Sequence, residues 1–153
     1  MKYKEVKEHY RTGNLEYHYL VDENGDECGE RRVYYANGEL GWHYFKRGLR
    51  YGEVKCFNPN GTLCHHFLAD GKGNRLATVI NYGKPSTHSE AQLIEIAKEH
   101  GLPLLSDIPK TEAELTHWNL KHPDRPLLPP VPIPSKPTQV GIINRIKQWF
   151  TAQ

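Results

Sequence analysis

The sequence has no marked excess of charge of either sign. Its 153 residues include 20 Lys and Arg against 18 Asp and Glu, a formal net charge of +2. Proteins that bind nucleic acid usually carry a basic patch or stripe, so this balance predicts no nucleic-acid partner. No apolar run approaches the roughly 18 residues of a membrane span, and the first residues lack the apolar segment of a signal peptide. We therefore expect a single domain, with or without an extension.

Cysteine is scarce too. The sequence holds Cys28, Cys56 and Cys64, an odd number without regular spacing, which indicates a reduced cytoplasmic protein. A dyad of Cys64 and His65 is disfavoured because adjacent residues of a strand point to opposite faces. The sequence also lacks glycine-rich phosphate loops, serine-centred nucleophile motifs and paired-carboxylate motifs. We therefore expect a protein that is not an enzyme and that binds no cofactor.

What the sequence does contain is an internal repeat. A turn glycine is followed by leucine at two residues, histidine at five and an aromatic residue at six, and this pattern begins at Gly13, Gly38 and Gly61. A second series of glycines recurs with the spacing of the last two copies, at Gly25, Gly48 and Gly71. Repeats of this kind indicate successive copies of one supersecondary unit.

Each copy predicts two short strands joined by tight turns, because Asn-Gly, Arg-Gly and Asp-Gly pairs separate runs rich in Tyr, Val, Phe and Trp. We expect an antiparallel β-meander of six or seven strands over residues 1–82. Strand alternation places Trp42 and Tyr44 on one face, and it places His18, His43 and His66 on the other. The aromatic face is expected to be the core, covered by the following helices, and the histidines to form a ladder on a solvated surface.

The segment Tyr34–Phe57, "YYANGELGWHYFKRGLRYGEVKCF", resembles the MORN-type repeat. It is closest to the degenerate bacterial version, and the resemblance covers about residues 8–82. It implies a ribbon of successive hairpins that serves as a binding surface. Bacterial proteins of this kind include those labelled as the antitoxin component of a toxin–antitoxin system, so the resemblance also implies a protein partner.

A helical segment is expected over residues 83–122, packed on the sheet. Thr87 to Glu90 reads as a capping box that opens a helix over about 88–100. A second capping box at Thr111 to Glu114 opens a short helix that His122-Pro123 ends.

The remainder divides into a proline-rich arm over residues 123–137, extended because proline lacks the N–H donor, and an amphipathic helix over 138–153. The helix could dock on its own sheet, insert into a partner or a second copy, or lie on a membrane surface. Its apolar stripe consists of Ile142, Ile143, Ile146, Trp149 and Phe150.

The leading hypothesis is a protein-binding module, antitoxin-like or an inhibitor, whose partner is a toxin, a host enzyme or an enzyme of phage defence. The C-terminal stripe is the first binding surface and the aromatic face around Trp42 and Tyr44 the second; a homodimer through the arm stays open. One alternative is a peripheral membrane or scaffold module that uses the same helix. Another is a metal-dependent enzyme on the histidine face near Cys64, although the spacing fits no zinc motif and we expect no metal.

Overall fold

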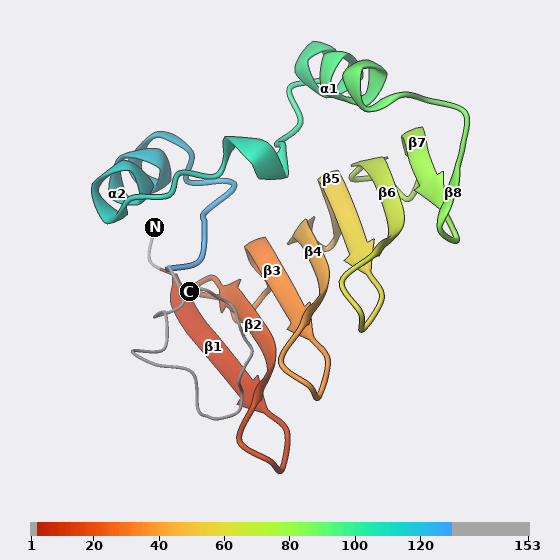
Figure 1. Cartoon of the computed structure of the whole chain (residues 1–153). Coiled ribbons are helices and arrows are strands. Elements are labelled where there is room, and N and C mark those ends of the chain that lie inside the picture. The colour runs from red at the N-terminus through yellow and green to blue at the C-terminus, as the bar shows by residue number, and fades with distance from the viewer. Residues whose placement is uncertain (1–2, 130–153) are drawn as a thin grey trace.

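The computed structural model describes residues 3–129, which form eight strands followed by two α-helices and a short 3-10 helix. The strands are β1 Lys4–His9, β2 Leu15–Val21, β3 Cys28–Tyr34, β4 Leu40–Arg47, β5 Leu49–Phe57, β6 Leu63–Asp70, β7 Arg75–Asn81 and β8 Lys84–Pro85. The helices are α1 Glu90–Glu99, η1 Leu105–Asp107 and α2 Glu112–Lys121. Every strand pairs antiparallel with its neighbours in sequence, in one sheet (Figure 1). The predicted β-meander followed by two helices is confirmed.

Neighbouring repeats are joined by side chains as well as by the strand ladder. The Tyr10 hydroxyl donates to the Tyr34 carbonyl at 2.7 Å, and one repeat later the Tyr35 hydroxyl donates to the Phe57 carbonyl at 2.7 Å. Each unit is thereby fixed to the next, as expected of a structure built by stacking short units along one direction.

The two α-helices start at identifiable caps. The Ser89 hydroxyl accepts from the Gln92 amide, and the Gln92 side chain accepts from the Ser89 amide, so this capping box opens α1 two residues after the predicted one at Thr87. The prediction was wrong because the His88 amide still bonds the Thr78 carbonyl of β7, which keeps the chain extended there. Helix α2 begins after Thr111 and ends before Pro123, as predicted.

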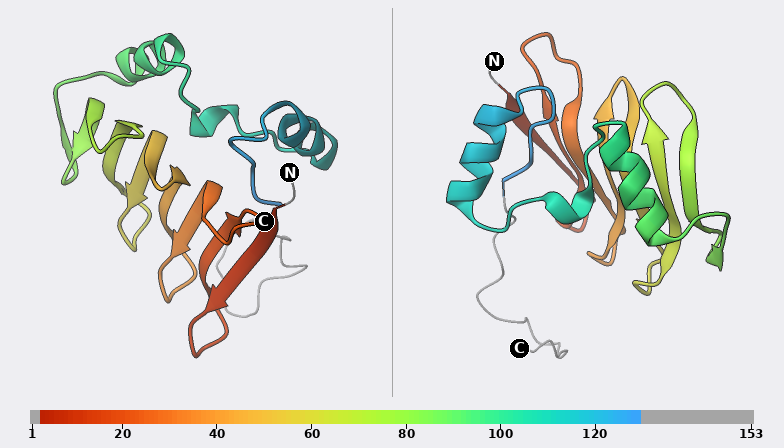
Figure 2. Two further views of the ribbon diagram at one scale, coloured as in Figure 1. Left: turned by 180° about the vertical axis from the view of Figure 1, so that it is seen from behind. Right: turned by 90° about the horizontal axis from the view of Figure 1, so that it is seen from above.

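All three helices lie over the same face of the sheet (Figures 1 and 2), and it is the histidine face. His18 and His66 are only 1% and 2% exposed, so the prediction of a solvated histidine ladder, with the helices over the aromatic face, was wrong. The physical reason lies two residues beyond each histidine, on the same face, where every repeat carries a large apolar side chain. These side chains are Leu20, Phe45 and Leu68, all buried.

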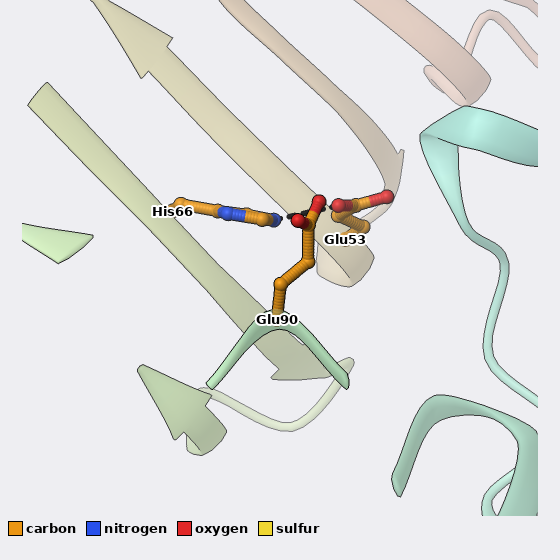
Figure 3. Close-up of side chains that lie close together, drawn as sticks. All are labelled: Glu53, His66 and Glu90. Atoms are coloured by element: carbon orange, nitrogen blue, oxygen red, sulfur yellow. Dashed lines mark hydrogen bonds and ion pairs between the residues drawn. The ribbon is translucent and has the colours of Figure 1, made fainter. Parts of the chain in front are cut away.

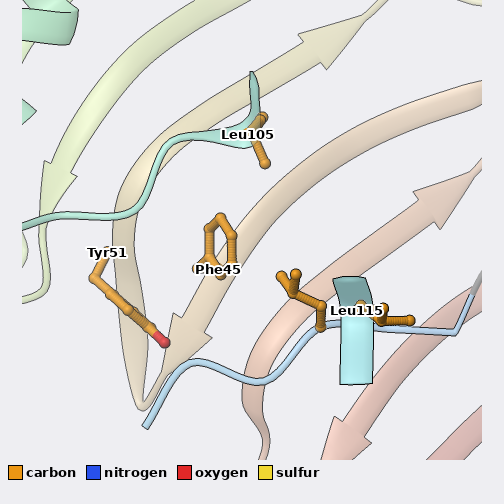
Figure 4. Close-up of a cluster of buried hydrophobic side chains, with 5 residues drawn as sticks. Phe45, Tyr51, Leu105 and Leu115 are labelled. Carbon is orange, nitrogen blue, oxygen red and sulfur yellow. The ribbon is translucent and has the colours of Figure 1, made fainter. Parts of the chain in front are cut away.

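The apolar side chains of the histidine face form two clusters with the extension. Leu68 and Ala77 of the sheet pack with Leu93, Ala97 and Leu104. Farther along the sheet, Phe45 and Tyr51 pack with residues of η1, α2 and the following segment (Figure 4). Those residues are Leu105, Leu115 and Leu127. Burying one leucine stabilises by about 1.5–3 kcal/mol, so these contacts are a substantial part of the fold.

Neither α1 nor α2 has the length and apolar character needed to cross a membrane, and the same holds for the rest of residues 3–129. Most of the predicted proline-rich arm, from residue 130, and the predicted helix over 138–153 lie outside the described residues.

Candidate functional site

Each histidine of the repeats bonds a glutamate of an earlier strand. The glutamate lies on the first strand of a hairpin and the histidine on the second, so the two side chains are diagonal neighbours on one face. The Nε2–Oε2 distances are 2.5 Å for His18–Glu5, 2.7 Å for His43–Glu30 and 2.6 Å for His66–Glu53.

The two buried glutamates are held ionised by their surroundings. Burial alone would raise the pKa of Glu30, but the His43 hydrogen bond and the Arg32 charge outweigh it and leave the pKa below its usual value. The balance is the same for Glu53, where hydrogen bonds from His66 and from the Leu105 amide lower the pKa against the effect of burial. Buried carboxylates are stable only with such partners.

His18 is neutral for the opposite reason. Burial lowers its pKa below the usual value, and the hydrogen bond and charge of Glu5 only partly offset this effect. Its Nδ1 finds no hydrogen-bond partner among residues 3–129, which fits an imidazole that carries its proton on Nε2 and donates it to Glu5.

Glu30 and Glu53 also hold a distant part of the chain. The Glu53 amide donates to the Pro103 carbonyl at 2.9 Å, and its Oε1 accepts from the Leu105 amide at 2.8 Å. The Glu30 amide donates to the Pro126 carbonyl at 2.9 Å, and its Oε1 accepts from the Leu128 amide at 2.7 Å. Two copies of a Pro-Leu-Leu sequence, 103–105 and 126–128, thus bind the sheet in the same way.

A glycine before each of these glutamates makes room for the segment. A Cβ at Gly29 would lie 2.3 Å from the Pro126 carbonyl oxygen, and a Cβ at Gly52 would lie 2.5 Å from that of Pro103. Both glycines also adopt positive φ, 91° and 86°, which disfavours any other residue. We call the groups Gly29–Glu30–His43 and Gly52–Glu53–His66 the Gly29 cradle and the Gly52 cradle.

The first repeat has the pair but not the cradle. Lys4 stands where the others have glycine, and Glu5 is about one-third exposed, at 34%. Within the described part of the chain no segment bonds the Glu5 amide or carboxylate as Pro-Leu-Leu does at the other two. The glycine therefore distinguishes an occupied site from an unoccupied one.

Glu90 of α1 lies beside the Gly52 cradle, so three ligand atoms, from Glu53, His66 and Glu90, fall within 4.8 Å of one another (Figure 3). This geometry could hold a metal ion through three protein ligands. However, both carboxylate oxygens of Glu53 already accept hydrogen bonds, from His66 and Leu105. The Gly29 cradle repeats those bonds with Arg32, not an acid, as an added partner of Glu30. The pair in common serves chain docking.

The opposite face of the sheet carries the aromatic residues. Trp42 and Tyr44, the predicted partner-binding residues of the sheet, both lie there with their rings edge to face at 6.4 Å. Trp42 also stacks on His65 at 6.0 Å. The helices α1, η1 and α2 all lie on the other side of the sheet (Figure 2), so no helix within residues 3–129 covers this aromatic face.

Arginine side chains cover part of the aromatic face instead. The Arg50 guanidinium lies 4.6 Å from the centre of the Trp42 ring and 5.0 Å from that of Tyr44. The Arg75 guanidinium lies 3.7 Å from the centre of the Phe67 ring. Within residues 3–129, neither arginine forms an ion pair with a carboxylate. A hollow of about 290 Å³ opens between them, lined also by Leu49, Phe67 and Ala69.

The other predicted site residues give a mixed picture. Ile142, Ile143, Ile146, Trp149 and Phe150 lie outside the described residues. Among the cysteines, burial raises the pKa of Cys56 to about 11, so its thiol is protonated near neutral pH and is a poor nucleophile.

The sequence reasoning found the histidines but missed their partners. The signals were present: Gly-Glu stands at the same distance before His43 as before His66, and Pro-Leu-Leu occurs twice with the spacing of the repeat itself. The two facts become connected only when the extension is seen lying along the sheet.

No family model matches this chain, and no curated protein or solved structure shows significant similarity to it.

Proposed function

We propose that this chain is a non-enzymatic protein-binding module that recognises an acidic protein surface through its aromatic face. The observation that carries the proposal is the difference between the two faces of one sheet. The chain covers the histidine face with its own helices, whereas rings and arginines line the other face without a covering element in residues 3–129. Sheets with two apolar faces are rarely left bare on one side.

The composition of the aromatic face supports a protein as the partner. Tryptophan, tyrosine and arginine are the residues that dominate binding energy at protein interfaces. Trp42 and Tyr44 are held in place by the sheet and by Arg50, so little side-chain freedom is lost on binding. Arg50 and Arg75 have donors left for a carboxylate, which makes acidic side chains the matching chemistry.

Within this class, an antitoxin or enzyme inhibitor is the reading we favour. It agrees with the small size of the chain and with the resemblance of its repeats to antitoxin-labelled bacterial proteins. The apolar stripe from Ile142 to Phe150 would add a second contact to the same partner, helix in groove.

The test is affinity capture with the full chain from native lysate, with nuclease added, followed by binding measurements on the purified captured protein. The double variant Arg50→Glu/Arg75→Glu reverses the charge of the face without touching the helices. We expect it to weaken binding at least tenfold, as loss of about 1.4 kcal/mol would. Leu120→Ala, at an exposed position on α2, is the matched control and should bind as the wild type does. Equal binding by all three proteins would contradict the proposal.

The C-terminal stripe is tested separately with Trp149→Ala/Phe150→Ala in the full chain. A further loss of affinity on top of the charge reversal supports two independent contacts. Unchanged affinity removes the helix from the interface but leaves the aromatic face in place.

One observation favours a second function, a metal-dependent activity, namely the group Glu53, His66 and Glu90. Elemental analysis of the purified full chain decides it, with Glu90→Gln as the comparison. Stoichiometric zinc, iron or manganese that Glu90→Gln loses would support this alternative; protein without metal, even after incubation with these ions, removes it.

A further inference from the structure

We propose that the Gly29 cradle is a reversible peptide-binding site for an extended Pro-Leu-Leu segment, and that residues 126–128 are its resident ligand. The site lies on the histidine face, away from the aromatic face, and is independent of the function proposed above. Its ligand class is an extended segment with proline first, leucine second and third, and a free N–H on the third residue.

Each part of the ligand is read by a separate group. The Glu30 amide reads the proline carbonyl, and Glu30 Oε1 reads the amide of the third residue, which a proline at that position would lack. Gly29 permits the close approach. His43 and Arg32 bond the other carboxylate oxygen and fix the orientation of Glu30. Leu127 and Leu128 are 1% and 2% exposed, so both side chains leave water when the segment binds.

The recognition resides in the three residues, because the two copies differ in everything around them. Leu105 begins the 3-10 helix η1, whereas Leu128 is followed by Pro129. Helix α1 precedes one copy and α2 precedes the other. Even so, the two hydrogen bonds to each glutamate have closely matching lengths at the two sites, 2.9 and 2.8 Å at Glu53 against 2.9 and 2.7 Å at Glu30. Two unrelated flanks and one geometry indicate a specific site.

The first repeat supplies the natural negative case. It keeps the glutamate, the histidine and a basic residue two residues after the glutamate, but Lys4 replaces the glycine and no Pro-Leu-Leu segment of residues 3–129 lies there. The glutamate–histidine pair alone therefore does not make the site.

Of the two ligands, 126–128 is the one that can leave. Segment 103–105 lies between α1 and α2, both packed on the sheet. Segment 126–128 is the last of the described chain, and on its N-terminal side it is tied to α2 by two bonds. The Trp118 Nε1 donates to the Arg125 carbonyl, and the Leu127 amide donates to Asn119 Oδ1. Release needs no helix to move.

The first experiment measures amide hydrogen exchange in the intact chain. We expect the Leu128 amide to exchange at least about tenfold faster than the Val54 amide of the sheet, because the segment opens locally. Gly29→Ala should remove the protection of Leu128 and leave that of Leu105 unchanged. Gly25→Ala is the matched control, since its φ is also positive but a Cβ there meets nothing within 4 Å. Exchange of Leu128 only with global unfolding would overturn reversibility.

The second experiment supplies the ligand in trans to a full chain with Leu127→Asp/Leu128→Asp, which expels the resident segment because new carboxylates would face Glu30. The probe is a blocked synthetic peptide of residues 122–131, followed by NMR. Burial of two leucines predicts a dissociation constant of about 0.1–1 mM, with shifts at Glu30 and His43.

A control peptide with proline in place of the third ligand residue, Leu128, should bind at least about tenfold more weakly, as should the natural peptide to the variant with Gly29→Ala added. Equal binding of both peptides, or none at about 5 mM with the sheet spectrum intact, would overturn the proposal. If the double Asp variant is unfolded, Leu128→Pro in the full chain replaces it, since it removes only the N–H donor.

Discussion

The two faces of this sheet both carry apolar surface but solve the problem of covering it differently. On the histidine face, leucines and Phe45 alternate with glutamates that need polar partners, and the extension supplies both apolar contacts and backbone amides. On the aromatic face, Val54 and Phe67 are buried under neighbouring rings and arginines. The comparison teaches that the chain folds back onto the face where buried carboxylates must be satisfied, not onto the face richest in aromatic rings.

The largest effect is expected from Glu30→Ala on the covered face. The change leaves Arg32, His43 and the Leu128 amide without their buried anion, and breaking such a network costs about 3–5 kcal/mol. Urea unfolding of the purified protein measures it. Glu39→Ala, an exposed acid of the same repeat, should stay within about 0.5 kcal/mol of the wild type. A loss of similar size in both variants would contradict the role given to Glu30.

A second comparison sets one apolar contact of each face against the other. Leu93→Ala opens a cavity between α1 and the sheet and should lower the free energy of unfolding by about 2–5 kcal/mol. Trp42→Ala removes a larger but half-exposed side chain with no covering element, so a smaller loss is expected. If Trp42→Ala proves the more destabilising, the aromatic face is the true core.

The pH dependence of stability should come from the covered face. The pKa of Glu30 and Glu53 is lowered by folding, so their contribution is present above the unfolded value of about 4.3 and is lost as pH falls through the folded pKa. The pKa of His18 is lowered too, so the unfolded chain binds its proton first and stability already declines below about pH 6.5.

Unfolding free energies measured from pH 7.5 to 5 test the histidine contribution. His18→Gln should flatten the decline by at most about 1.4 kcal/mol per pH unit, the limit for one proton. An unchanged slope would assign the decline to other groups.

The smallest effect is expected from Arg50→Ala on the aromatic face. An exposed cation over a ring contributes about 0.5–1 kcal/mol, so thermal unfolding should change little while partner binding weakens. A large loss of stability would make Arg50 a structural residue of the fold.

Much of the fold could be predicted from sequence. Repeated turn glycines and alternating strands predict the meander, and Thr111 and Pro123 predict the limits of α2. The covered face could not be predicted from the repeats alone, since both faces alternate polar and apolar residues. What decides it is a contact between Glu30 and Leu128, far apart in the chain, and no local pattern reports a contact so distant. The cap of α1 was misplaced for the same reason, because the bonds of His88 to β7 are tertiary.

The central claim is that the uncovered aromatic face is the binding surface. The most direct measurement is the hydrogen-exchange footprint of the purified captured partner on the full chain. The account predicts added protection in β4 to β6 around Trp42, Tyr44 and Phe67, with α1 and α2 unchanged. A footprint confined to α1 and α2, with the aromatic strands exchanging as in the free protein, would contradict it.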